Sequence, residues 1–284
     1  MSQDPAGLKL APLTTWLTSA IPGFDGSAQV TADLLAGGRS NISYKLSDAS
    51  GKQYVLRRPP LGNIMPTAHD MGREFRVLSG LNTVNYPVPL ALGHCEDESI
   101  IGAHFMVMNF VDGMVVADQH DAQQLDVEQA QRISYSLVRT LASLHQINPT
   151  SAGLENLGKP HGYLQRQASR WIGQWDLTKT RELPGIIDLH RWIEGKLKHL
   201  PENLPTGIVH GDYRIDNVIL DRTNQDILAV LDWEMATLGD PISDLAISLV
   251  YWSQRTDTLR KNIPVAEHVT EGSGFFTREE FVAE

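Results

Sequence analysis

The chain has 284 residues, a formal net charge of −10 and an isoelectric point near 5.4. This acidity argues against a nucleic-acid partner, because phosphate backbones require clustered Lys and Arg side chains. Since no apolar run approaches the roughly 20 residues of a membrane-spanning helix, and the amino-terminal residues lack the pattern of a signal peptide, we expect a cytoplasmic protein without a membrane partner.

The first half of the chain predicts a small sheet with one helix. Apolar and alternating runs indicate strands at residues 30–36, 42–47, 53–56, 88–93 and 104–110. Gly51 closes the turn of a hairpin between the second and third strands, and Pro59 ends the third strand. The helical spacing of Phe75, Leu78 and Leu81 predicts a helix from about residue 69 to residue 81.

Beyond Asp112-Gly113 the pattern becomes helical. Residues 126–147 place apolar side chains on one face, with Asp126 as the N-cap. Helices are also expected at 160–177 and 184–199, and Trp171 and Trp175 on the first of these are expected to pack into the core.

This pattern divides the chain into three parts. We expect a helical or irregular amino-terminal extension over residues 1–29, a small lobe over 30–111 and a helical large lobe over 112–284. Thr277 and Glu280 predict a capping box that opens a helix close to the last residue. Because so short a helix is marginal, we expect the carboxyl-terminal part of the large lobe to be incomplete.

Polar residues gather at one end of a hairpin predicted in the second half. His210, Asp212 and Asn217 follow the spacing H-x-D-x-x-x-x-N, and two short strands then lead to Asp232. Phosphoryl transfer needs a carboxylate to accept the proton of a hydroxyl, and oxygen ligands to hold Mg²⁺ against the phosphates. The alternative is a polar loop that satisfies backbone groups, and it does not account for the convergence of three such residues.

The chain resembles the aminoglycoside phosphotransferase and choline kinase superfamily from about residue 30 onward. The motifs that carry this resemblance are HGDYRIDN (210–217), LDWE (231–234) and GDPISDLA (239–246). Residues 163–171 and 231–241 look most similar to the branch associated with acyl-CoA dehydrogenases. The resemblance implies an α+β, two-lobed, protein-kinase-like fold. Its small lobe has a five-stranded antiparallel sheet with one helix, and its larger lobe is mostly helical and carries the catalytic hairpin.

The resemblance also assigns roles to individual residues. It implies Asp212 as the catalytic base and Asn217 and Asp232 as Mg²⁺ ligands. It implies that the backbone of an inter-lobe hinge binds the adenine of ATP at Asn109 and Val111, although periodicity alone indicates a buried strand there. The residues that would cover the phosphates are Gly37, Gly38, Arg39, Ser40 and Asn41. As bare sequence, these five residues are equally typical of an ordinary hairpin turn.

Arg57 stands where kinases carry a phosphate-binding Lys on the third strand, and Glu74 follows on the next helix. Strand alternation sends Arg57 and Arg58 to opposite faces of the sheet. We therefore predict that Arg57 lies beside Asp232 and pairs with Glu74, with Asp70 as the rival carboxylate. If Arg58 faced the cleft instead, the phosphate role would pass to it.

Among the other polar residues near the motif, Arg214 has two interpretations, and the rest are expected to be structural. Arg214 is suited to neutralise the transferred phosphate, and a surface salt bridge is an equally good interpretation. His210 is expected to orient the loop, Asp240 and Asp244 to support it, and His145 to be a hydrogen-bonded core residue.

These observations favour an ATP- and Mg²⁺-dependent kinase whose acceptor is a hydroxyl-bearing small molecule. The branch that the chain resembles suggests a hydroxyacyl compound or its CoA thioester, and a functional link to an acyl-CoA dehydrogenase. A non-catalytic nucleotide-binding regulator and an aminoglycoside kinase are the alternatives. A protein kinase is disfavoured, because the chain lacks an Ala-Pro-Glu element and has Asp-Trp-Glu in place of Asp-Phe-Gly.

Overall fold

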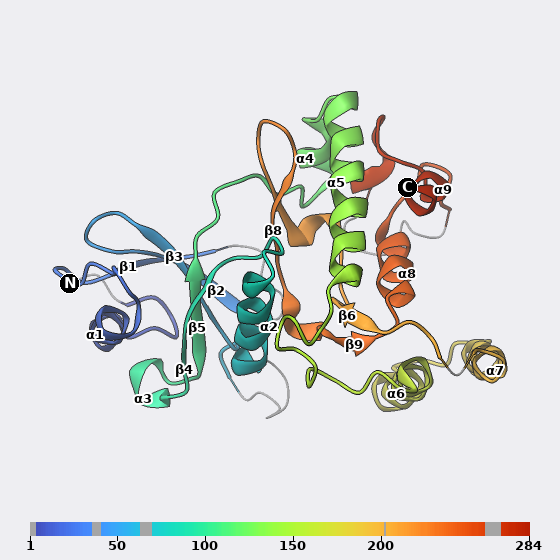
Figure 1. Ribbon diagram of the computed structural model, residues 1–284, viewed down its shortest axis with the longest axis horizontal. Coiled ribbons are helices and arrows are strands. Elements are labelled where there is room, and N and C mark those ends of the chain that lie inside the picture. The colour runs from blue at the N-terminus through green and yellow to red at the C-terminus, as the bar shows by residue number, and fades with distance from the viewer. Residues whose placement is uncertain (1–3, 36–40, 63–69, 202, 259–267) are drawn as a thin grey trace.

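The computed structural model describes residues 4–35, 41–62, 70–201, 203–258 and 268–284. Within these ranges the chain forms two lobes that lie side by side (Figure 1). The small lobe contains strands β1 to β5 and helices α1 to α3, and the large lobe contains the remaining elements, which are mostly helical. The two-lobed α+β architecture is therefore the one predicted.

The small lobe is built on a five-stranded antiparallel sheet with the strand order β1-β2-β3-β5-β4. Its strands are β1 (Thr31–Leu34), β2 (Ile42–Ser47), β3 (Gln53–Arg58), β4 (Ala91–Cys95) and β5 (Phe105–Asn109). Strands β2 and β3 form the predicted hairpin. Strand β4 begins at Ala91 and not at Val88, because Pro87 and Pro89 cannot donate ladder hydrogen bonds there.

Helices cover both faces of this sheet (Figure 1). Helix α1 (Leu10–Ala20) buries Leu13 and Leu17 against one face. Helix α2 (Met71–Thr83) packs on the other face and begins at its N-cap, Asp70. The single turn α3 (Glu98–Ile101) was not predicted, because four residues are too few to show a helical period.

The hydrophobic core beneath α2 is shared by the two lobes. Val77 and Leu81 of α2 belong to the same cluster of buried side chains as Ile133 and Leu137 of the large lobe. The residues under α1 form a second cluster on the outer face of the sheet. Because burial of apolar area is the main force that holds packed elements together, the shared core fixes α2 against the large lobe.

Helix α5 (Val127–Gln146) is the central helix of the large lobe, and Asp126 caps it in a capping box with Gln129. The other helices are α4 (Gln119–Gln123), α6 (Tyr163–Thr178), α7 (Ile186–Leu197), α8 (Ile242–Tyr251) and α9 (Arg278–Ala283). The 3₁₀ turns are η1 (Ile215–Asn217), η2 (Trp233–Met235) and η4 (Val269–Glu271). Thr277 and Glu280 form the predicted capping box of α9.

Two short antiparallel pairs carry the predicted motif. They are β6 (Gly207–Val209) with β9 (Thr237–Gly239), and β7 (Val218–Leu220) with β8 (Ile227–Val230). The loop that joins β6 to β7 contains the H-x-D-x-x-x-x-N motif, and Asp232 follows β8. The hairpin therefore presents these residues at one end, as predicted.

Helices α6 and α7 lie next to each other at the edge of the large lobe (Figure 1). Both helices were predicted, but neither contains a fully buried residue within the described part of the chain. The expectation that Trp171 packs into the core is wrong, since its side chain is 59% exposed, and Trp175 is only partly buried. Several apolar side chains of this pair are exposed, among them Leu177, Ile187 and Trp192. None of the helices in the described ranges combines the length and apolar character needed to cross a membrane.

Candidate active site

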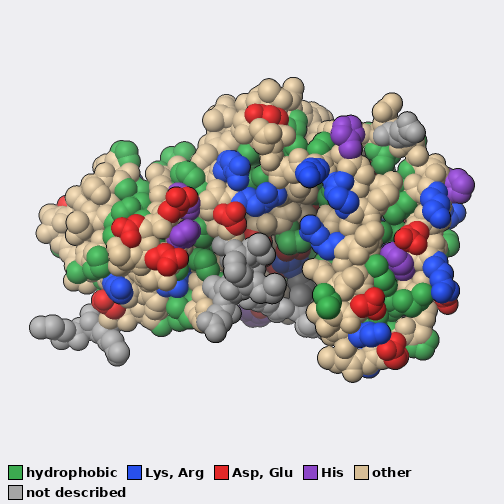
Figure 2. Space-filling view, turned by 90° about the horizontal axis from the view of Figure 1, so that it is seen from below, with side chains coloured by type: hydrophobic (Ala, Val, Ile, Leu, Met, Phe, Trp, Pro, Cys, Tyr) green, Lys and Arg blue, Asp and Glu red, His purple; other side chains and the backbone are tan. Residues whose placement is uncertain are grey.

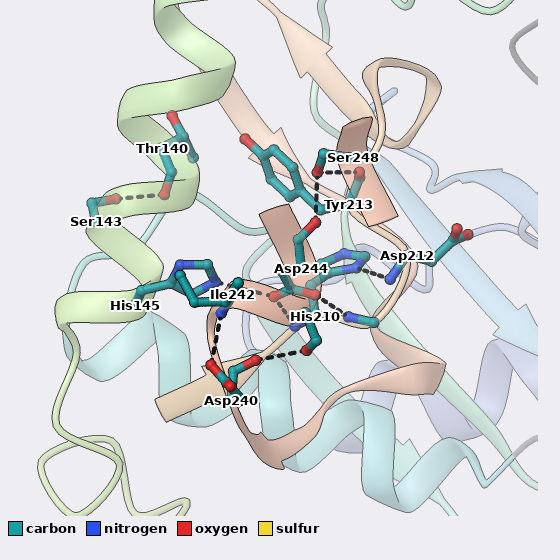
Figure 3. A network of polar contacts seen from close by, with 12 residues as sticks. Thr140, Ser143, His145, His210, Asp212, Tyr213, Asp240, Ile242, Asp244 and Ser248 are labelled. Carbon is teal, nitrogen blue, oxygen red and sulfur yellow. Dashed lines mark hydrogen bonds and ion pairs between the residues drawn. The ribbon is translucent and has the colours of Figure 1, made fainter. Parts of the chain in front are cut away.

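Asp244 on α8 holds the backbone of the loop that carries the motif (Figure 3). Its buried carboxylate accepts hydrogen bonds from the backbone nitrogens of His210 and Gly211, both at 2.7 Å. Gly211 has a φ of +87°, and a Cβ there would meet the Met235 backbone. His145 reaches the same carboxylate through Nε2 at 3.2 Å, so Asp244 and His145 have the supporting places that were predicted.

His210 orients the loop through both ring nitrogens. Its Nε2 donates to the carbonyl oxygen of Leu231 at 2.9 Å, and its Nδ1 accepts from the backbone nitrogen of Asp212 at 3.2 Å. Burial lowers the pKa of this imidazole, which is therefore neutral near pH 7. The ring thus links the start of the loop to the segment that precedes Asp232.

Asp212 points out of the loop with both carboxylate oxygens engaged. Its Oδ1 lies 3.0 Å from Nε of Arg214, and its Oδ2 accepts from Nδ2 of Asn217 at 3.1 Å. Burial raises the pKa of the Asp212 carboxyl to about 6, although Arg214 and the Asn217 hydrogen bond act in the opposite direction. A carboxylate with a pKa near neutrality is suited to accept a proton.

Arg214 forms a mostly buried ion pair, with only 12% of its side chain exposed, and is not the surface salt bridge of the alternative interpretation. Its Nη1 lies 3.2 Å from Oδ2 of Asp216, and its guanidinium stacks over the ring of Tyr251. The stacking and the second carboxylate hold the cation beside Asp212.

Arg57 forms the ion pairs predicted for it. Its Nε lies 3.1 Å from Oε2 of Glu74, and its Nη2 lies 2.5 Å from Oδ1 of Asp232. Burial raises the pKa of the Glu74 carboxyl to about 7, and Arg57 opposes this shift. The rival carboxylate, Asp70, instead caps α2.

Arg58 lies on the other face of the sheet, where it is buried and donates to the carbonyl oxygens of Gly7, Pro59 and Ile101. The predicted strand register is therefore confirmed. Asp232 itself adopts a left-handed backbone, with φ 65° and ψ 63°. Non-glycine residues rarely take this conformation, and such strain often accompanies functional sites.

A cavity of about 140 Å³ lies between the lobes, next to Arg57 and Asp232. Apolar side chains from both lobes line it, together with the hinge that includes Asn109 and Val111. Its apolar lining residues include Leu35, Val55, Leu78, Met108, Ile219 and Leu231. Such a slot fits a flat, apolar-faced group such as a nucleobase, with the charged residues at one end of it.

Asn41 and Glu234 join the two lobes at the edge of this site. Nδ2 of Asn41 donates to Oε2 of Glu234 at 3.0 Å. Glu234 was not predicted as a site residue, although its place two residues after Asp232, in the LDWE motif, was the available signal. The predicted phosphate-loop residues Gly37, Gly38, Arg39 and Ser40 lie outside the described residues.

The donor chemistry of the site fits Mg²⁺. Asn217 and Asp232 offer an amide and a carboxylate oxygen, the ligand types that this hard cation prefers. In the described part of the chain, no group of three or more His, Cys, Asp and Glu residues could hold a metal ion.

On the face shown in Figure 2, side chains of both charge signs are interspersed over the two lobes. This mixture differs from the single basic stripe that is typical of nucleic-acid-binding domains.

These features define a kinase-like phosphotransferase, and comparison with known proteins names the family. The model of the phosphotransferase enzyme family matches residues 31–278. A crystal structure from Ralstonia eutropha, assigned as an aminoglycoside phosphotransferase, is 32% identical with a TM-score of 0.77, covering 96% of this chain and 78% of that chain. The chain therefore belongs to the phosphotransferase enzyme family, and its kinase-like fold is confirmed.

Acyl-CoA dehydrogenase family member 11 of Rattus norvegicus is 36% identical over 275 residues, which are 95% of this chain and 34% of that protein. This relative agrees with the branch that the sequence resembles. The chain spans about a third of the length of the curated relatives it matches. A thermostable mutant of aminoglycoside phosphotransferase APH(4)-Ia, in a ternary complex with AMP-PNP and hygromycin B, shares only the fold. It is 18% identical with a TM-score of 0.59, covering 85% of this chain and 77% of that chain.

Proposed function

We propose that the chain is an ATP- and Mg²⁺-dependent kinase that transfers the γ-phosphoryl group to a hydroxyl of a small molecule. The observation that carries the proposal is the grouping of Asp212 and Asn217 at one end of the hairpin that leads to Asp232. Arg57 touches Asp232 beside an apolar cavity between the lobes. A base, two oxygen ligands, a phosphate-binding cation and a nucleobase slot are the parts that phosphoryl transfer needs.

In this proposal Asp212 accepts the proton of the acceptor hydroxyl. The hydroxyl oxygen bonds to the γ-phosphorus, the bond from that phosphorus to the bridging oxygen breaks, and ADP leaves with the electron pair. Arg214, held beside Asp212, balances negative charge on the transferred group. Asn217 and Asp232 hold Mg²⁺, which when bound neutralises phosphate charge. Arg57 contacts the α- and β-phosphates.

We propose a hydroxyacyl compound or its CoA thioester as the acceptor. The support is that the longer relatives are acyl-CoA dehydrogenase family members and match this chain over 95% of its length. The same names support a functional link between this phosphotransferase and an acyl-CoA dehydrogenase. An aminoglycoside kinase is the second candidate, favoured by the assignment of the Ralstonia eutropha structure.

A transfer assay with γ-labelled ATP tests these proposals. The acceptor panel contains hydroxyacyl-CoA thioesters, the matching free hydroxy acids and aminoglycosides. We expect label on a hydroxyacyl acceptor, and transfer by the Asp212→Asn protein that is slower by about 100-fold or more. Label on aminoglycosides alone would favour the second candidate. MgATP binding without transfer to any acceptor would favour a non-catalytic regulator.

A further inference from the structure

A hydrogen bond between Asn41 and Glu234 connects residues that are 193 positions apart in the chain. Asn41 precedes the first residue of β2 in the small lobe, and its side chain is 2% exposed. Glu234 lies in η2 of the large lobe, two residues after Asp232. A hydrogen bond to a carboxylate is charge-assisted, so it is stronger than one between neutral groups.

The segment of the large lobe that contains Glu234 also contacts two other elements of the small lobe. Arg57 of β3 pairs with Asp232 at 2.5 Å, and Nη2 of Arg73 on α2 donates to the carbonyl oxygen of Ala236 at 2.6 Å. Three separate elements of the small lobe are thus fastened to residues 232–236. This segment begins at the proposed Mg²⁺ ligand.

The position of Asn41 relates the bond to the nucleotide cavity. Ser43, two residues further along, lines that cavity. Asn41 lies in a bend directly before β2, and its hydrogen bond to Glu234 ties the start of the strand that carries Ser43 to the large lobe. A bond made by Asn41 to the large lobe therefore sets how closely β2 approaches the cavity.

We propose that Asn41 and Glu234 are positioning residues that hold β2 against the large lobe and thereby set the affinity for MgATP. This inference rests on the proposed kinase function. It assigns the Glu234 carboxylate the task of accepting from Asn41. In this role it matters that one of the two side chains donates a hydrogen bond and the other accepts it. It matters less which of the two carries the negative charge.

A cycle of four proteins separates these requirements: the wild type, Asn41→Asp, Glu234→Gln and the double variant. MgATP affinity is measured by calorimetry. Asn41→Asp places two carboxylates against each other and is expected to weaken binding by about 10- to 100-fold, the equivalent of one charge-assisted hydrogen bond.

The double variant exchanges donor and acceptor while keeping the total charge. We expect it to bind MgATP within about threefold of the wild type, because the two changes are coupled and not additive. Asn156→Asp, which adds the same charge at an exposed position, is the matched control and should bind normally. If Asn41→Asp binds like the wild type, or the double variant binds as weakly as Asn41→Asp, the proposal is overturned.

Two further measurements keep the test decisive. If Asn41→Asp does not fold, Asn41→Ala replaces it, and that variant should also weaken binding, because it lacks the donor to Glu234. If the wild-type chain binds no MgATP, the proposed kinase function fails. The hydrogen bond between Asn41 and Glu234 is then tested by the thermal unfolding midpoints of the four proteins without nucleotide. Recovery of the midpoint in the double variant supports the bond, and no recovery contradicts it.

Discussion

Asp212 illustrates how a single environment sets the chemistry of a residue. Burial raises the pKa of its carboxyl, while Arg214 and Asn217 favour the charged form. The result is a pKa of about 6, between the usual value for aspartate and that of a fully buried acid. A base of this kind is mostly ionised at neutral pH and still basic enough to accept a proton.

The first prediction concerns the pH dependence of turnover. Only ionised Asp212 can accept a proton, so kcat/KM should fall as the pH drops through about 6 and reach a plateau above about 7. Arg214→Gln removes a charge that lowers this pKa, so its limb should move to higher pH. Initial rates from pH 5 to 9 at saturating MgATP check both outcomes. A rate independent of pH across this range would exclude Asp212 as the titrating base.

The second prediction concerns Arg57. Arg57→Ala leaves Glu74 and Asp232 without their shared cation, so KM for ATP should rise and kcat should fall together. Breaking a buried ion pair also costs about 3 kcal/mol or more of unfolding free energy. Arg57→Lys should retain part of the activity, because it keeps the charge but loses the fork geometry. Steady-state kinetics with urea unfolding of each protein separate the two effects, and an unchanged KM for Arg57→Ala would contradict the phosphate role.

At the scale of elements, the exposed pair α6–α7 differs most from the rest of the large lobe. Its helices carry apolar residues at helical spacing, but their described side chains are at most partly buried. Trp233, by contrast, is fully buried and donates from its indole nitrogen to the carbonyl oxygen of Val230 at 2.9 Å. Trp171 and Trp233 belong to the same lobe, but only Trp233 is buried in its core.

The third prediction compares these two tryptophans. Trp171→Ala should change the free energy of unfolding by no more than about 1 kcal/mol, as is usual for exposed side chains. Trp233→Ala removes a buried aromatic and should cost about 3 to 5 kcal/mol. Urea unfolding of both variants provides the measurement. A similar loss for the two variants would mean that Trp171 is buried in solution.

Periodicity predicted most elements, because helices and strands show their buried faces in the sequence. Residues 42–47 form a strand over their predicted range, and α5 starts at its predicted N-cap, Asp126. Periodicity does not say what an apolar face packs against, which is why Trp171 was assigned to the core. It also missed α3, which is only one turn long.

The sequence also predicted most of the candidate site, but not every contact in it. Motif spacing brought Asp212, Asn217 and Asp232 together, and strand alternation placed Arg57 on the correct face of the sheet. The bond between Asn41 and Glu234 was not foreseen, because it joins two lobes whose relative placement no local pattern encodes. Contacts between distant segments depend on tertiary packing, and one sequence does not show it.

In the whole molecule, the shared core and the contacts of the small lobe with residues 232–236 hold the two lobes together. The proposed nucleotide site lies between them, so it is complete only when both lobes are folded and in contact. A ligand that binds only this folded arrangement must stabilise the whole chain.

The fourth prediction follows from that linkage. MgATP at about 100 times its dissociation constant should stabilise the chain by about 2.7 kcal/mol, and thermal unfolding should show the corresponding rise in midpoint. Asp232→Ala removes a charged ligand of the ion, so MgATP should no longer raise its midpoint. An equal rise in both proteins would place the metal site elsewhere.

The central claim is that this chain is a kinase with Asp212 as its base. It is tested most directly by comparing the wild type and Asp212→Asn for transfer of the γ-phosphoryl group and for MgATP affinity in the same preparation. The account predicts that Asp212→Asn lowers kcat by about 100-fold or more and leaves MgATP affinity largely intact, because Asp212 contacts the acceptor hydroxyl and not the nucleobase. Turnover by Asp212→Asn close to that of the wild type would contradict the account.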